Sequence, residues 1–252
     1  MHITIQSFGR PSNVPLMHQS LGHLKPTWYV PESQASDYEK QGAIVYPVKE
    51  QPFPMKTHQL NSALDQGFER GDMVVCMDDD FKYCRIKENE HIPLATFIEQ
   101  MGSKLEHSRF FIAGITNISN AFWISGKVRE YGNLPGAITI HKPNKIRYDT
   151  NLKMLEDLDV CIQHHVEHGG IIRDETAALR FEILSVNKKH TQEGGYGRSR
   201  EKLQKSTLTY IQEKFNSPFI TFPLDSAPGE NVHSQILWPK FVRAENTLDK
   251  FF

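Results

Sequence analysis

The 252-residue sequence is poor in cysteine, has no long apolar run and carries almost no net charge. Its three cysteines are widely spaced and form no CxxC pair, which indicates neither a disulfide framework nor a structural zinc site. The longest apolar runs, 73–77 and 110–115, are far too short to cross a bilayer, and residues 1–10 lack the apolar core of a signal peptide. We therefore expect a cytoplasmic protein with no membrane contact.

Charges of the two signs nearly balance, with 29 Lys and Arg against 30 Asp and Glu, which argues against strong nucleic-acid binding by the chain as a whole. Residues 188–205 depart from this balance, because six cations and two acids give them a local net charge of +4. Such a segment suits either contact with phosphate groups or an ordinary solvated helix face. The cations are Lys188, Lys189, Arg198, Arg200, Lys202 and Lys205.

The first eighty residues alternate between short strand and helix patterns. Strands are predicted near 3–5, 27–30 and 43–46, and helices near 15–21, 35–42 and 60–68. The uninterrupted apolar run 73–77 is typical of a strand that is covered on both faces. The pattern predicts an α/β fold with a mostly parallel central sheet.

The rest of the chain has a looser, α+β pattern. It contains strand-like runs at 109–115 and 136–141, a helix over 155–168 and a late helix over 199–215. Residues 216–252 carry four prolines among scattered aromatics, which suits an extension packed over the body. We predict one domain over 1–215, with halves 1–80 and 81–215, and a C-terminal extension over 216–252.

Three consecutive carboxylates, Asp78, Asp79 and Asp80, follow the predicted buried strand. Open α/β sheets bind ligands at the carboxyl ends of their strands. Clustered carboxylates repel one another, so a bound cation would stabilise them, and oxygen-only ligands favour Mg²⁺ or Mn²⁺ bridged to substrate phosphates. The alternative is an exposed acidic turn.

A second acidic run, Glu156, Asp157 and Asp159, opens the predicted helix over 155–168. Carboxylates in a first helical turn have an ordinary explanation, because they complement the helix dipole. Two separate acidic runs also suit a reaction with a metal-bound leaving group on one side and a general base on the other. Both interpretations stay open at this point.

The order of these features resembles the GT-A glycosyltransferases. The stretch from Lys56 through Asn61 and Gly71 to the Asp triplet is similar to their nucleotide-sugar half with its DxD signature, and the second run is similar to the EDxD motif of inverting, family 2-like members. More narrowly, the chain resembles the phage-type TET-associated glycosyltransferases, which are thought to glycosylate hydroxymethylated pyrimidines in DNA. Further matching segments are 5–11, 30–32, 148–149 and 194–195, so the resemblance spans about residues 1–200.

The resemblance implies roles for individual residues. Asp157 is the leading candidate for the general base, with Glu156 and Asp159 as rivals, and Asp80, Asp78 and His190 are the candidate metal ligands. The implied contacts to the donor nucleotide sugar are Ser7, Arg10, Glu32, Lys56, Asn61, Asp78, Asp79, Gly194, Gly195 and Arg198.

The function that the resemblance implies is a metal-dependent, inverting hexosyl or pentosyl transfer from a UDP-sugar. The expected acceptor is a 5-hydroxymethylpyrimidine in phage DNA, inside the host cytoplasm, with the cations of 188–205 as candidate phosphate contacts. A glycan, lipid or protein hydroxyl is the alternative acceptor. Two other classes of protein are alternatives. One is a sugar-1-phosphate nucleotidylyltransferase, which should carry a Gly-rich, basic loop after the first strand, and residues 7–11 match such a loop poorly. The other is a non-catalytic nucleotide or nucleic-acid binding module.

Overall fold

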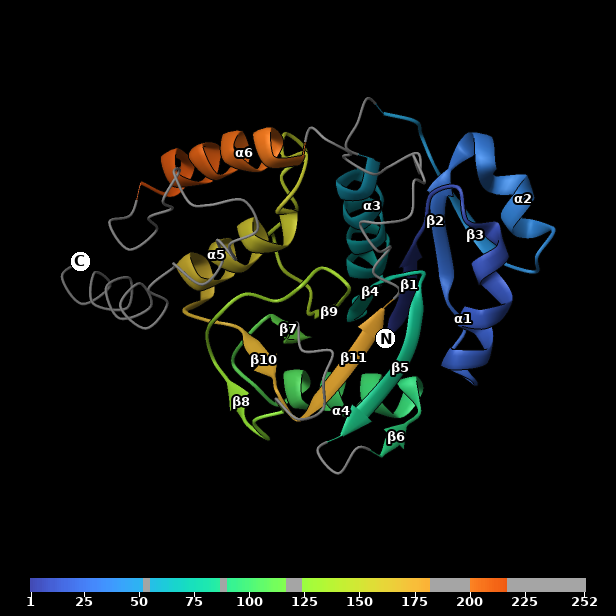
Figure 1. The fold of residues 1–252 in the computed structure, drawn as a ribbon, viewed down its shortest axis with the longest axis horizontal. Helices are drawn as coiled ribbons and strands as arrows, with labels where there is room; N and C mark the ends of the chain where they lie inside the picture. Colours follow the sequence, from blue (N-terminus) through green and yellow to red (C-terminus); the bar gives the residue numbers. More distant parts are fainter. Residues whose placement is uncertain (52–54, 87–89, 117–123, 182–199, 217–252) are drawn as a thin grey trace.

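A large, mostly parallel β-sheet flanked by helices organises the protein (Figure 1). This computed structural model describes residues 1–51, 55–86, 90–116, 124–181 and 200–216. The predicted extension over 216–252 lies, except for its first residue, outside the described residues. The mixed architecture confirms the predicted α/β class.

The large sheet contains strands from both predicted halves of the chain. In spatial order they are β3 (Ile44–Val48), β2 (Thr27–Pro31), β1 (His2–Gln6), β4 (Val74–Asp78), β9 (Ile138–His141), β7 (Ile112–Ile115), β10 (Ile172–Asp174) and β8 (Val128–Arg129). The pairings from β3 to β4 are parallel, β9 runs against β4 and β7, β10 is parallel to β7, and β8 is antiparallel to β10. Gln6 lies opposite Asp78, so the chain leaves β1 and β4 at the same edge of the sheet.

A second, three-stranded sheet begins directly after the Asp triplet. Its strands, in spatial order, are β11 (Ala177–Phe181), β5 (Phe81–Ile86) and β6 (His91–Ile92). Figure 1 shows β5 and β11 side by side, and they pair antiparallel. Asp78 ends β4 and Phe81 begins β5, so the triplet occupies the junction between the two sheets.

Six α-helices and two short 3₁₀ helices are present in the described ranges. They are η1 (Pro11–Asn13), α1 (Val14–Leu21), η2 (Glu32–Gln34), α2 (Ala35–Glu39), α3 (Met55–Glu69), α4 (Leu94–Glu106), α5 (Glu156–His168) and α6 (Arg200–Phe215). None of these helices combines the length and the apolar content that crossing a bilayer demands.

Two hydrophobic cores lie on opposite faces of the large sheet. Side chains alternate along a strand, so Val74 and Cys76 of β4 join the core under α3, α5 and α6. Val75 and Met77 join the core under α1, α2 and α4. Both faces of β4 are therefore covered, as its apolar sequence predicts.

Gly67 lets α3 pack closely on β4. A Cβ added at Gly67 would overlap Val74 Cγ2, inside a packed core. We expect Gly67→Ala to lower the free energy of unfolding by about 1–3 kcal/mol, although alanine is the better helix former. Urea denaturation measures this, with Gly102→Ala of α4 as the control, since its Cβ would meet chiefly the flexible Met1 side chain. Equal stability of the Gly67 variant and the wild type would contradict this packing.

Candidate functional site

Asp79 is the buried member of the triplet. Its Oδ2 accepts a hydrogen bond from Ser7 Oγ, and Arg10 Nη2 lies 2.5 Å from its Oδ1. The Ser7 hydroxyl is also 2.5 Å from the Tyr38 hydroxyl. Burial raises the pKa of the Asp79 carboxyl to about 6, although Arg10 and Ser7 oppose the rise. Ser7 and Asp79, both predicted donor contacts, thus fasten the loop after β1 to the end of β4.

Arg10 connects this buried network to the surface. Its Nη1 lies 3.4 Å from Asp80 Oδ2, its backbone N–H donates to the Tyr38 hydroxyl at 2.9 Å, and its side chain is 30% exposed. Burial and the neighbouring Asp78 carboxylate raise the pKa of Asp80 to about 6. Arg10 is consequently a fixed, solvent-accessible cation beside the predicted metal ligand Asp80.

Lys56 joins the two acidic runs. It lies in the first turn of α3, and its Nζ is 3.0 Å from Asp78 Oδ1 and 3.5 Å from Glu156 Oε1. Burial alone would lower the pKa of Lys56, but these carboxylates raise it above the ordinary value, so the ammonium stays charged. Burial raises the pKa of Glu156, and Lys56 opposes that rise. The structure therefore brings together two runs that lie far apart in the sequence.

Asp157 is held in one orientation at the start of α5. Its Oδ1 accepts from the Leu158 N–H at 2.8 Å and its Oδ2 from the Gly136 N–H at 3.3 Å. Leu155, directly before the helix, has a φ of 60°, a left-handed conformation that non-glycine residues adopt rarely and that turns the chain into α5. A half-buried carboxylate fixed by two backbone donors is chemically suited to accept a proton.

The structure does not bring two predicted site residues, Asp159 and Asn61, to these carboxylates. Asp159 is fully buried and accepts hydrogen bonds from Lys214 Nζ at 2.8 Å and Gln163 Nε2 at 2.6 Å. Asn61 forms two hydrogen bonds of 2.9 Å with the backbone of Tyr148, so it ties α3 to the segment before α5. The contacts of both residues are thus structural, with Lys214 and Gln163 for Asp159 and with Tyr148 for Asn61.

The remaining predicted residues are only partly placed. Glu32 is exposed in η2, directly after β2, at the sheet edge from which β1 and β4 also emerge. The other predicted donor, metal and phosphate contacts lie outside the described residues, namely Lys188, Lys189, His190, Gly194, Gly195 and Arg198. Arg200, Lys202 and Lys205 belong to α6, but their side chains also lie outside what the structure describes.

We use the name acidic cluster for Asp78, Asp79, Asp80, Glu156 and Asp157 with their counter-ions Arg10 and Lys56. Five carboxylates and two cations give it a formal charge of −3. In the described ranges, no three His, Cys, Asp or Glu side chains are already grouped to hold a metal ion. Oxygen-only ligands and a charge deficit suit Mg²⁺ or Mn²⁺, but Asp78 and Asp80 would first have to leave Lys56 and Arg10.

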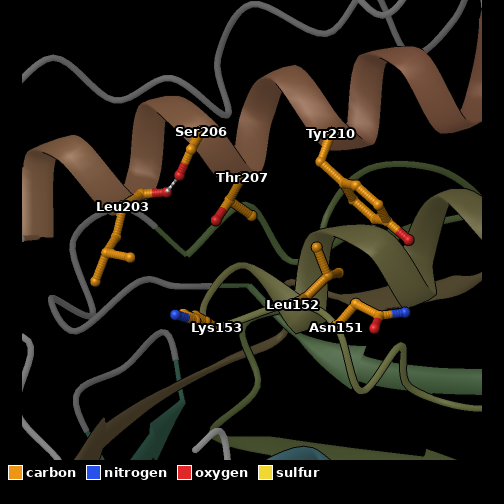
Figure 2. Close-up of a pocket in the computed structure, with 7 residues that line it drawn as sticks. All are labelled: Asn151, Leu152, Lys153, Leu203, Ser206, Thr207 and Tyr210. Carbon is orange, nitrogen blue, oxygen red and sulfur yellow. Dashed lines mark hydrogen bonds between the residues drawn. The ribbon is translucent and has the colours of Figure 1, made fainter.

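A cavity of about 200 Å³ lies between α6 and the segment that leads into α5 (Figure 2). Its lining residues are Asn151, Leu152, Lys153, Leu203, Ser206, Thr207 and Tyr210. The Tyr210 hydroxyl donates to Asp149 Oδ2 at 2.9 Å, and Lys214 binds the same oxygen at 2.8 Å. No sequence motif marks this cavity, because its lining comes from two distant segments that meet only in the folded chain.

Comparisons with known proteins give little guidance. No protein-family model matches the chain, and no curated protein matches it. Among solved structures, the crystal structure of A197 from STIV is similar over 73% of this chain and 86% of that chain. The sequence identity is 12% and the TM-score is 0.40, so this likeness carries no argument about activity.

Proposed function

We propose that the protein is a metal-dependent, inverting glycosyltransferase of the GT-A fold that transfers a sugar from a UDP-sugar to a hydroxyl group. The observation that carries this proposal is the meeting of the two acidic runs around Lys56. The position of the Asp triplet, at the carboxyl edge of a mostly parallel sheet, also supports it, because such edges bind ligands.

The donor side of the proposed site consists of the Asp triplet and Arg10. Asp80 and Asp78 would hold a Mn²⁺ or Mg²⁺ ion, which supplies positive charge to offset that of the departing diphosphate. A diphosphate is itself an anion, and a cluster of formal charge −3 would repel it without such a cation. Arg10, fixed by Asp79, is the side chain of this group placed to contact the phosphates.

The acceptor side consists of Asp157 and Glu156. Asp157 would take the proton from the acceptor hydroxyl while the oxygen of that hydroxyl bonds to the anomeric carbon. The bond between that carbon and the diphosphate breaks at the same time, and UDP departs with the bonding electrons. Direct displacement inverts the anomeric centre and needs no covalent enzyme intermediate.

The proposed acceptor is a 5-hydroxymethylpyrimidine in DNA, modified in the cytoplasm. The +4 charge of residues 188–205 in the sequence supports a phosphate-bearing acceptor. Such a base must be single-stranded or flipped out of the duplex to reach a protein site. A glycan, lipid or protein hydroxyl is the alternative. A non-catalytic binding module is favoured only by the buried ion pairs of Asp79 and Asp159, which show that some of these acids are structural.

The test is a reaction of the purified protein with Mn²⁺, a panel of UDP-sugars and DNA with or without 5-hydroxymethylcytosine, in duplex and single-stranded form. Nucleoside mass spectrometry should detect a hexose or pentose added only to the hydroxymethylated DNA. UDP release without modified DNA would retain the transferase and reject the DNA acceptor. If neither added sugar nor UDP release is detected with any donor, the result favours the binding module.

A further inference from the structure

Lys56 links three elements that come from separate parts of the chain. It belongs to α3, Asp78 ends β4, and Glu156 begins α5. The exposed fractions of the three side chains are 36%, 28% and 17%, so this trio is partly shielded from water. Charge interactions are stronger in such surroundings than at a fully hydrated surface.

One ammonium group serves two carboxylates here. The distance from Lys56 Nζ to Asp78 is 3.0 Å and to Glu156 is 3.5 Å, so neither carboxylate has the cation to itself. Gly136 leaves room beside the ammonium, since a Cβ there would lie 3.5 Å from Nζ. A change of charge at one carboxylate must therefore alter how strongly Lys56 binds the other.

We propose that Lys56 is a positioning residue that couples the donor side of the site to the acceptor side. This inference rests on the proposed function for the metal ion at Asp78 and for the naming of the two sides. A divalent cation that arrives at Asp78 competes with the ammonium and shifts it toward Glu156. Neutralisation of Glu156 has the opposite effect, because it leaves the ammonium entirely to Asp78. Such coupling is reciprocal, so each side reports the charge state of the other.

The experiment measures Mn²⁺ affinity by isothermal titration calorimetry in the wild type, Lys56→Met, Glu156→Gln and the double variant. Lys56→Met should bind Mn²⁺ about 10-fold more tightly, because the competing ammonium is gone. Glu156→Gln should weaken Mn²⁺ binding about 10-fold in the wild type and only about two-fold in the Lys56→Met background. Lys56→Arg, which keeps the charge, should restore affinity to near the wild-type value.

The outcomes separate this inference from the proposed function. Equal effects of Glu156→Gln in both backgrounds, or weaker Mn²⁺ binding by Lys56→Met, would overturn the coupling and leave an ordinary structural ion pair. Absence of Mn²⁺ binding by both the wild type and Lys56→Met would overturn the coupling together with the metal site. Coupling without sugar transfer to any acceptor would uphold the inference and reject the transferase. Lys56→Gln replaces Lys56→Met if circular dichroism shows that the latter does not fold.

Discussion

Asp157→Asn should lower the rate of sugar transfer by about 100- to 10,000-fold, the usual contribution of a general base. Asparagine has nearly the same shape, and its side-chain oxygen can still accept from the Leu158 or Gly136 N–H groups that orient the residue. The asparagine amide, however, cannot take up the proton of the acceptor hydroxyl. Binding of the UDP-sugar should change by no more than about two-fold, since Lys56 forms its ion pairs with Asp78 and Glu156, and Asp157 is held by backbone N–H groups. Steady-state UDP release gives kcat, and calorimetry gives the Kd of the donor.

Asp159→Asn is the matched control for this prediction. It makes the same change two residues further along α5, where the carboxylate binds Lys214 instead of facing the acidic cluster. It should lower the free energy of unfolding and have a much smaller effect on kcat. Full activity of Asp157→Asn, or an equal loss of kcat in both variants, would assign the base to another residue.

The second large effect concerns stability in acid and arises from a buried histidine. The His164 ring centroid lies 6.1 Å from that of His141 and 5.4 Å from that of His168. Neither nitrogen of the His164 ring has a hydrogen-bond partner among the described residues, and burial lowers its pKa well below 6.5. In the unfolded chain this ring takes up a proton below about pH 6.5, whereas in the folded protein it stays neutral. The contribution of His164 to the free energy of unfolding must therefore fall as the pH falls.

His164→Leu isolates this contribution. Relative to the wild type, its free energy of unfolding should rise by about 1.4 kcal/mol for each pH unit below 6.5, or about 2 kcal/mol at pH 5. The wild-type curve alone does not isolate this slope, because other groups also titrate. Burial lowers the pKa of His141 to about 3 and that of His165 to about 4, which adds to the slope, whereas Asp79 and Asp80, with pKa values raised to about 6, oppose it. Urea denaturation at pH 7.5 and pH 5 measures the difference.

Val166→Leu is the control for the pH series, since it changes an exposed, non-titrating side chain on the same helix. Its effect on the free energy of unfolding should be the same at both pH values. A His164→Leu effect that is also independent of pH would mean that this ring is protonated equally in the folded and unfolded states.

The first eighty residues were readable from sequence because their signals are local. The apolar run 73–77 predicts β4, and the spacing of Leu60, Ala63, Leu64 and Phe68 predicts α3. The predicted elements do not include α4, although its apolar residues repeat at helical spacing and offer a usable signal. These residues are Leu94, Phe97, Ile98, Met101 and Leu105. The small sheet has a weaker local sequence signal, because β5 and β11 pair across almost a hundred residues of chain.

The position of the Asp triplet at a sheet edge could also be predicted, but not the surroundings of each acid. The strand before the Asp triplet places it at a sheet edge. Which of the three is buried depends on Ser7 and Arg10, some seventy residues away in the sequence. Likewise, the spacing of the second run does not distinguish Asp157 from Asp159, because the difference comes from Lys214, which is 55 residues distant. Tertiary partners assign these roles.

The ion pair of Asp159 and Lys214 has a consequence for how this chain can diverge. Asp159 pairs with a lysine on α6, whereas Asp157 belongs to the acidic cluster and accepts hydrogen bonds from the backbone N–H groups of Gly136 and Leu158. In related chains, positions 159 and 214 should therefore change together, and a chain that loses the lysine should be free to lose the third acid. Position 157 should change only in chains whose reaction no longer needs a general base there. Two acids of one short motif, separated by a single residue, are thus under different evolutionary constraints.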